Sequence, residues 1–330
     1  MRSKEERRAD GPRVVVVGCG RWGRNHVRNY ADLGALAGIV DERPEVAAEL
    51  SAAHCVPALT LDAALADPEV AGLVFALPPS RNLPLGRRVL AAGKHLFVEK
   101  PLALSVADGA ALCQAADDAG RALMVGHILQ YHPAFRALAD LVAAGRLGRL
   151  LSLVSTRLDL GRVRREEDAL WALAPHDVSM ILTLAGTEPT GVSASGGYHT
   201  HPTIADAAAI ELAFPGGPRA EIRASWLHPI KEQQLVAVGT DAMAVFDDRA
   251  PWPEKLLLHP YRLEAGETGP AVARGEPSAV AVDAREPLGE ECRAFLRAIA
   301  SGDAPPSDGR EGLRVLSVLE RASAAMLSHR

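Results

Sequence analysis

The chain has 330 residues, of which 48% are hydrophobic and 23% charged, and its formal net charge is −5 at pH 7. This length exceeds what one hydrophobic core usually supports and therefore predicts two domains. Nucleic-acid binding requires clustered positive charge, so the acidic balance predicts no nucleic-acid partner.

The cysteine pattern and the apolar runs predict a cytoplasmic protein without a membrane partner. The four cysteines are scattered and form no CxxC pair, so we expect neither a zinc site nor a disulfide framework. No apolar run reaches the ~18 residues that a membrane span needs. Residues 1–12 are charged and lack an apolar signal core, and we expect them to form a flexible lead-in.

Residues 13–130 alternate short apolar, β-branched runs with helical patterns. Strands are predicted at 13–18, 36–41, 71–77, 94–100 and 121–127. Helices are predicted between them, one of which begins at Pro44. Strands alternating with helices form βαβ units, so this region predicts an α/β domain with a doubly wound parallel sheet.

A glycine-rich loop follows the first predicted strand and begins a helix. Its spacing is Gly18-x-Gly20-x-x-Gly23, which allows a tight turn and close approach of backbone N–H groups to a pyrophosphate. Asp41 ends the next strand, where a carboxylate accepts hydrogen bonds from a ribose 2′-hydroxyl and repels a 2′-phosphate. This favours NAD over NADP, although the nearby Arg43 opposes that choice. The alternative is a structural glycine turn with an unrelated aspartate.

The fourth predicted strand ends in Glu99-Lys100-Pro101. Ligands of such sheets bind at the carboxyl ends of the strands, which is where a nicotinamide would lie. A lysine there can donate to a substrate hydroxyl and, when partly desolvated, exchange a proton near neutral pH. The alternative is an ordinary surface lysine.

From residue 131 onwards the pattern changes to an α+β domain on a mixed, largely antiparallel sheet. Strands are predicted at 149–160, 189–198, 205–214, 219–227, 233–239 and 242–246. Helices are predicted at 175–185, 287–301 and 309–327, and the Gly/Pro-rich stretch 264–285 is predicted as a surface loop. An exposed sheet face would need covering, which predicts a homodimer or homotetramer.

His176 follows Pro175 at the predicted start of a helix. The core-facing positions of that helix are Val178, Ile181, Leu182 and Ala185. At about 100° per residue, His176 points about 160° away from Val178. The helix N-terminus disfavours imidazolium, which leaves a neutral ring able to accept a proton. Asp177 is interpreted as a helix-start acid. The alternative for His176 is a hydrogen-bonded interior histidine.

Two other groups of polar residues are candidates for ligand contacts. The basic run Arg157, Arg162, Arg164 and Arg165 is either a solvated face or a set of donors for a substrate diphosphate. His127 and His132 flank Tyr131 after the fifth strand and are candidates for lining a cleft. The remaining histidines lack metal-ligand spacing, so the sequence predicts no metal.

Three stretches resemble the Gfo/Idh/MocA family of NAD(P)-dependent oxidoreductases. They are GCGRWGRNH at 18–26, VFALPPSRNLPLGRRVLAAGKHLFVEKPLALS at 74–105 and MVGHILQYHPAF at 124–135. Residues 156–182 and 224–248 are similar to the UDP-N-acetylglucosamine 3-dehydrogenase-like branch of that family. The resemblance implies a Rossmann domain, a substrate-binding and oligomerisation domain, and reversible hydride transfer at a carbinol carbon.

The resemblance also implies a substrate class. We expect a nucleotide sugar such as UDP-N-acetylglucosamine, oxidised at C3 to a 3-keto sugar. The alternatives are a 3-ketosugar reductase, a dehydrogenase for inositol or a free sugar, and a non-catalytic NAD-sensing protein.

The resemblance assigns roles to individual positions. Lys100 and His176 are the catalytic candidates. Cofactor contacts are expected from Gly18, Gly20, Arg21, Trp22, Gly23, Asp41, Arg43, Leu77, Pro78, Asn82 and Glu99. Substrate contacts are expected from His127, Gln130, Tyr131, Arg157, Arg164 and Trp171. The chain departs from the family pattern at Leu77-Pro78, Asn82 and Gln130. It also has Ala172 where the family commonly has an aspartate four residues before the catalytic histidine.

Overall fold

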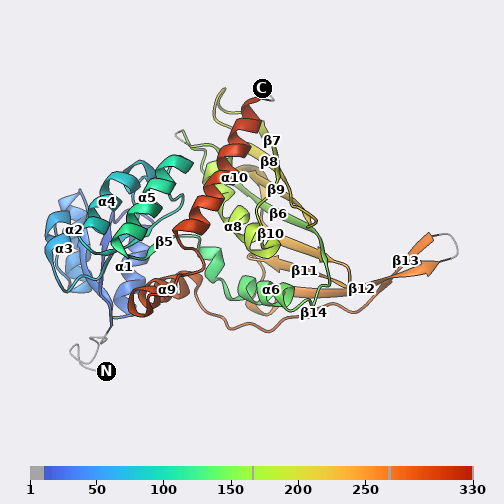
Figure 1. Cartoon of the computed structure of the whole chain (residues 1–330), viewed down its shortest axis with the longest axis horizontal. Helices are drawn as coiled ribbons and strands as arrows, with labels where there is room; N and C mark the ends of the chain where they lie inside the picture. Colours follow the sequence, from blue (N-terminus) through green and yellow to red (C-terminus); the bar gives the residue numbers. More distant parts are fainter. Residues whose placement is uncertain (1–10, 166, 267–268, 329–330) are drawn as a thin grey trace. The chain divides into compact units, whose positions relative to one another are not determined.

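The computed structural model describes residues 11–165, 167–266 and 269–328 (Figure 1). Residues 1–10 of the predicted lead-in lie outside this range. The chain forms two compact units: one runs to Ile128 and also takes in Glu286–Leu316, and the other comprises Leu129–Arg285 and the chain from Ser317. The prediction assigned everything after residue 130 to the second domain. The segment Glu286–Leu316 returns to the first unit because its apolar face packs there: the rings of Phe97 and Phe295 lie 5.8 Å apart.

The first unit is built on a five-stranded parallel sheet in the order β2-β1-β3-β4-β5, which confirms the doubly wound α/β fold. Its strands are β1 (Val14–Val17), β2 (Leu36–Val40), β3 (Gly72–Phe75), β4 (His95–Val98) and β5 (Leu123–Val125). All four residues of β1 are buried, because helices cover both faces of the sheet.

Six helices belong wholly to the first unit. They are α1 (Gly23–Asp32), α2 (Pro44–His54), α3 (Leu61–Ala66), α4 (Asn82–Ala91), α5 (Val106–Ala119) and α9 (Pro287–Ser301). Their ends follow local chemistry: Pro44 and Pro287 occupy the first turns of α2 and α9, and Ser105 caps α5 by accepting from the Asp108 N–H. Within the described part of the chain, no helix is both long and apolar enough to cross a membrane.

The second unit is built on a nine-stranded mixed sheet, as predicted. Its main path runs β13-β12-β11-β10-β6-β9-β8-β7, in which β6 and β9 are parallel and the other neighbours antiparallel; β14 pairs with β12. The strands are β6 (Leu150–Leu160), β7 (Gly191–Gly197), β8 (Ala207–Ala213), β9 (Arg219–Ser225), β10 (Leu227–Gly239), β11 (Ala242–Asp247), β12 (Leu256–Gly266), β13 (Gly269–Arg274) and β14 (Ser278–Ala279).

Helices pack on one face of this sheet. They are α6 (Pro133–Ala143), α7 (Ala169–Leu173) and α8 (Pro175–Ala185), while α10 (Gly309–Ser328) runs through both units. Short 3₁₀ turns lie at η2 (Pro79–Arg81), η3 (Ile128–Tyr131) and η4 (Trp252–Glu254). Burial alternates along β8 and β9, so that Ile210 and Ile222 are buried while Glu211 and Arg223 are exposed. The second face of the sheet therefore carries polar side chains.

The predicted surface loop at 264–285 is wrong over much of its length. Residues 256–266 and 269–274 form an antiparallel hairpin with Tyr261 opposite Arg274, and β14 pairs with β12. Figure 1 shows β13 reaching away from the other strands of this unit. Gly and Pro are uncommon inside strands, which explains why composition alone indicated a loop.

Candidate active site

The glycine loop between β1 and α1 forms a cradle for a ligand. Gly18 has φ +84°, a conformation that favours glycine, and a Cβ on Gly23 would lie 1.9 Å from the Gly18 carbonyl oxygen. A Cβ on Gly20 would meet nothing within 4 Å. The outer glycines are thus needed for the turn and for close packing, while Gly20 borders open space. This arrangement fits a pyrophosphate at the start of α1.

A cavity of about 780 Å³ lies beside the glycine loop, at the carboxyl ends of β1, β2 and β3. Six residues that the sequence predicted as cofactor contacts line it: Gly18, Gly20, Asp41, Arg43, Leu77 and Pro78. Leu59, Thr60, Leu61, Arg81, Leu85 and Arg88 also line it, and the sequence reasoning had not named them. Its position at the switch point of the sheet fits the adenosine end of a dinucleotide.

Asp41 is not an isolated carboxylate in this cavity. Its Oδ1 lies 2.9 Å from Arg43 Nε and its Oδ2 lies 3.0 Å from Arg43 Nη2, while the backbone N–H of Cys19 donates to Oδ2 at 2.6 Å. The hydrogen bonds from Arg43 lower the pKa of Asp41 to about 2. Burial and the Asp41 charge together raise the pKa of the Cys19 thiol to about 12, so this thiol is not a nucleophile. Asp41 and Arg43 therefore line this cavity as an ion pair.

Lys100 is the second residue after β4 and is partly exposed. The preceding Glu99 is turned inwards. Its Oε2 lies 3.3 Å from the backbone N of Lys100, and its Oε1 lies 2.6 Å from His26 Nε2 and also accepts from Trp22 Nε1. Glu99 was predicted as a cofactor contact, but its carboxylate links the glycine loop to the Lys100 backbone. Trp22 and the neighbouring Arg21 remain exposed on the loop.

Asn82, another predicted cofactor contact, is fully buried. Its Nδ2 donates to the carbonyl oxygens of Pro101 and Leu102, at 3.2 and 3.1 Å. The side chain is enclosed at the start of α4, and its direct contact with a cofactor stays a prediction. Asn82 instead holds the segment that follows Lys100.

Asn82→Ala is expected to lower the free energy of unfolding by about 1–3 kcal/mol, because two buried carbonyls lose their donor. Urea denaturation measures this as a lower midpoint with an unchanged slope. Arg87→Ala removes an exposed side chain of the same helix and should stay within about 0.5 kcal/mol of the wild type. A loss no larger than that of the control would contradict this role for Asn82.

In the second unit, His176 is the second residue of α8 and is half-buried. Val178, Ile181 and Leu182 are buried, as the helical period predicted. Met180, which is not one of the predicted core-facing positions, is buried as well, because α8 is enclosed by β6, β9, α6 and α7. His176 therefore reaches the surface from a helix that is buried on most of its sides.

Asp177 lies in the first turn of α8, which agrees with its interpretation as a helix-start acid, but its role goes further. Its carboxylate is fully buried and accepts from Arg157 Nε at 2.6 Å and Nη2 at 3.1 Å, and from Ser155 Oγ at 2.7 Å. Burial alone would lower the pKa of Arg157, but the Asp177 carboxylate outweighs it and raises that pKa. Arg157 thus ties β6 to α8, and its contact with a substrate diphosphate stays a prediction.

Three further predicted substrate contacts are buried in the structure. The amide nitrogen of Gln130 lies 2.7 Å from Thr183 Oγ1 and 3.0 Å from the Ser179 carbonyl oxygen, so it fastens η3 to α8. His127 Nδ1 lies 2.6 Å from a carboxylate oxygen of Glu311. Tyr131 is 6% exposed. These three side chains are thus buried, and their direct contacts with a substrate stay a prediction.

Arg164 and Trp171 keep surface access. Arg164 is exposed and forms an ion pair with Glu167, and Trp171 is half-buried in α7. Ala172, at the position of the family aspartate, is buried against Ala169 and Trp226.

Sequence reasoning missed the contact of His26 with Glu99 and the burial of Glu291 on α9. His26 lies inside the GCGRWGRNH stretch, and its position three residues after Gly23 was a usable signal. Glu291 carries no such signal, because an isolated glutamate in an amphipathic helix is typical of a solvated face.

Comparisons with known proteins agree with this arrangement. A model of an oxidoreductase family with an NAD-binding Rossmann fold, GFO_IDH_MocA, matches residues 12–127, and a GFO/IDH/MocA C-terminal domain model matches residues 135–245. The UDP-N-acetylglucosamine 3-dehydrogenase of Acidithiobacillus ferrooxidans is 32% identical over 319 residues, covering 95% of this chain and 97% of that protein. Its solved structure superimposes with a TM-score of 0.84 at 31% identity, over 96% and 97% of the two chains. The inositol 2-dehydrogenase of Rhizobium meliloti is 25% identical, over 96% and 98%.

Proposed function

Because the chain belongs to the Gfo/Idh/MocA family of oxidoreductases, we propose that it transfers a hydride between NAD and a carbinol carbon of a nucleotide sugar. The carbon we favour is C3 of a substrate such as UDP-N-acetylglucosamine, which gives a 3-keto sugar. The observation that carries this choice is the 32% identity to a dehydrogenase of that name over nearly the whole of both chains.

The proposed chemistry rests on residues of both units. NAD, when bound over the glycine loop, supplies the hydride acceptor. Lys100 donates to the reacting hydroxyl and stabilises negative charge that develops on its oxygen. His176 accepts the hydroxyl proton as a general base. The roles of Lys100 and His176 are open to exchange, since both can move a proton.

The cofactor preference depends on Asp41. Asp41→Ser is expected to raise the ratio of kcat/KM for NADP to that for NAD at least about tenfold, because Arg43 then has a 2′-phosphate as its partner. Arg43→Ala should move the ratio the other way, and steady-state kinetics with both cofactors measures it. A wild-type enzyme that prefers NADP, or a ratio that neither variant changes, would contradict the proposal.

The substrate assignment is tested by following NADH formation with UDP-sugars, dTDP-sugars, inositols and free sugars. We expect UDP-N-acetylglucosamine to give the highest kcat/KM and a ketone at C3 by NMR. The match to an inositol 2-dehydrogenase makes inositol the second candidate, and preferential turnover of inositol would replace the first. Tight NAD binding without turnover of any compound would indicate a non-catalytic NAD-sensing protein.

We also propose that the second unit forms the contact of a homodimer or homotetramer. The exposed face of its sheet carries Arg219, Glu221 and Arg223 on β9 and Glu211 on β8. Arginines and glutamates alternate there, which gives a self-complementary surface for an isologous contact.

A further inference from the structure

Three titratable side chains meet beneath the glycine loop, all within the first unit. His26 comes from α1, Glu99 follows β4, and Glu291 comes from α9. One ligand atom of each lies within 4.8 Å of the other two. His26 and Glu291 are fully buried, and the Glu99 side chain is 12% exposed. The cluster therefore joins α1, the segment that follows β4, and α9.

Glu291 is the unusual member. Both of its carboxylate oxygens are buried and have no hydrogen-bond partner among the described residues. A bare carboxylate in such a place costs several kcal/mol, so it must take up a proton or a cation. Burial, followed by the charge of Glu99, raises the pKa of Glu291 well above its usual value.

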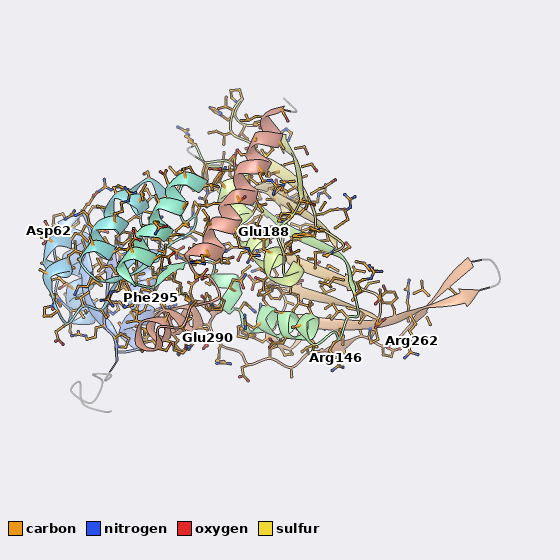
Figure 2. All side chains as sticks on the ribbon, viewed as in Figure 1. Asp62, Arg146, Glu188, Arg262, Glu290 and Phe295 are labelled. Carbon is orange, nitrogen blue, oxygen red and sulfur yellow. The ribbon has the colours of Figure 1, made fainter. Side chains whose placement is uncertain are left out.

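In the part of the chain that the structure describes, no ion pair or hydrogen bond reaches the Glu291 carboxylate. On α1, His26 is directed at Glu99, with Nε2 2.6 Å from Oε1, and its Nδ1 lies 3.9 Å from Cys292 Sγ. Burial and the nearby acids raise the pKa of Cys292, so its thiol stays neutral. The arginines on these helices have surface partners: Arg293 pairs with Glu290, and Arg28 with Glu286. Figure 2 shows Glu290 and Phe295 on α9.

We propose that Glu291 is a protonated carboxylic acid that presents its proton to the carboxylate of Glu99, an oxygen of which lies within 4.8 Å, and that it thereby acts as a positioning residue for Lys100. Glu99 is the link, because its other contacts are Trp22 and His26 on one side and the Lys100 backbone N on the other. A proton donor at Glu291 restrains the Glu99 carboxylate on the side of α9. The part of the proposal that concerns the positioning of Lys100 rests on the proposed function. The part that concerns the proton on Glu291 is independent of it.

The first experiment measures the thermal midpoint against pH for the substrate-free protein. A raised pKa in the folded state means that the stabilising effect of the proton is complete below about pH 4.5, the ordinary glutamate value, and is lost as pH rises through the raised value. Glu291→Gln keeps a donor without titrating. Its midpoint relative to wild type should therefore be lowest near pH 4.5 and should rise by at least about 2 °C towards pH 9.

Glu290→Gln is the matched control, since it removes a carboxylate from the neighbouring position that already has a surface partner. It should show no such rise. A Glu291→Gln midpoint that is shifted equally at every pH would overturn the buried proton. The effect of metal ions gives a second way to overturn the buried proton. If Mn²⁺ or Zn²⁺ raises the thermal midpoint of the wild type but not that of Glu291→Gln, the cluster holds a cation in place of the proton.

The second experiment tests positioning with whichever substrate the enzyme turns over. Glu291→Leu fills a similar volume without a donor, and it should lower kcat about tenfold with little change in the dissociation constant of NAD. Glu291→Gln should restore kcat to within about threefold of the wild type. Equal kcat values for the Leu variant and the wild type would overturn the positioning role and leave the substrate-free result, and hence the buried proton, intact.

Discussion

Lys100→Ala is expected to lower kcat by about 10²–10⁴-fold, the usual contribution of a positioned proton-transfer group. Lys100 is the second residue after β4, at the edge of the sheet where the ligands of doubly wound folds bind. Its partial exposure leaves the ammonium able to reach a ligand. The glycine cradle and the adenosine cavity do not depend on the Lys100 side chain, so the dissociation constant of NAD should stay within about twofold. Single-turnover kinetics and NAD titration measure the two quantities separately.

Two companion variants sharpen this test. Lys94→Ala removes a lysine from just before the same strand, where its Nζ donates to the carbonyls of Asp67 and Val70, both at 2.7 Å. It should cost stability and leave kcat nearly unchanged. His176→Ala, measured in the same assay, should resemble Lys100→Ala if both residues move the hydroxyl proton. Normal turnover in the Lys100 variant would remove the lysine from the mechanism.

Asp177→Ala is expected to lower the free energy of unfolding by about 3–5 kcal/mol, the usual cost of leaving one partner of a buried ion pair alone. The guanidinium of Arg157 would lose both of its contacts with the carboxylate in a site where it is only 8% exposed. Ser155 Oγ would lose its acceptor at 2.7 Å as well. Guanidinium denaturation with paired spectroscopic probes measures the loss.

The double variant Asp177→Leu with Arg157→Met separates the ion pair from the packing. Replacing both charged side chains by apolar ones of similar size leaves no unpaired charge. The double variant should therefore lose less free energy of unfolding than the sum of the losses in the single variants Asp177→Leu and Arg157→Met. A loss below about 1 kcal/mol in Asp177→Ala would show that water reaches Arg157 and that the pair is not a buried one.

Much of the fold could be predicted because periodicity and helix-end signals are local. Pro287 and the following apolar period placed α9 at its observed bounds, 287–301, and the β-branched run ending at Gly18 placed β1. The hairpin of β12 and β13 could not be predicted, because backbone pairing sustains it despite a Gly/Pro-rich composition. Local patterns also gave no sign that α9 returns to the first unit.

The site was predicted where a motif specifies backbone shape and missed where tertiary neighbours decide. The glycine spacing placed Gly18, Gly20 and Asp41 around one cavity. The position of Asp177 along its helix does not indicate that β6 packs nearby. Arg157 of β6 nevertheless forms an ion pair with the Asp177 carboxylate. Asn82 and Gln130 likewise occur in stretches with a ligand-binding resemblance, yet their amides are used for internal hydrogen bonds.

The return of Glu286–Leu316 to the first unit has a consequence for how the protein is made on the ribosome. Synthesis runs from the N-terminus, so the five parallel strands emerge long before α9. Until then the surface around Phe97 lacks its partner Phe295, and the nucleotide-binding half waits for more than half of the chain to be translated. This half therefore does not complete its folding as an early, independent domain, and a nascent chain arrested before residue 286 carries an uncovered apolar surface that invites chaperone binding.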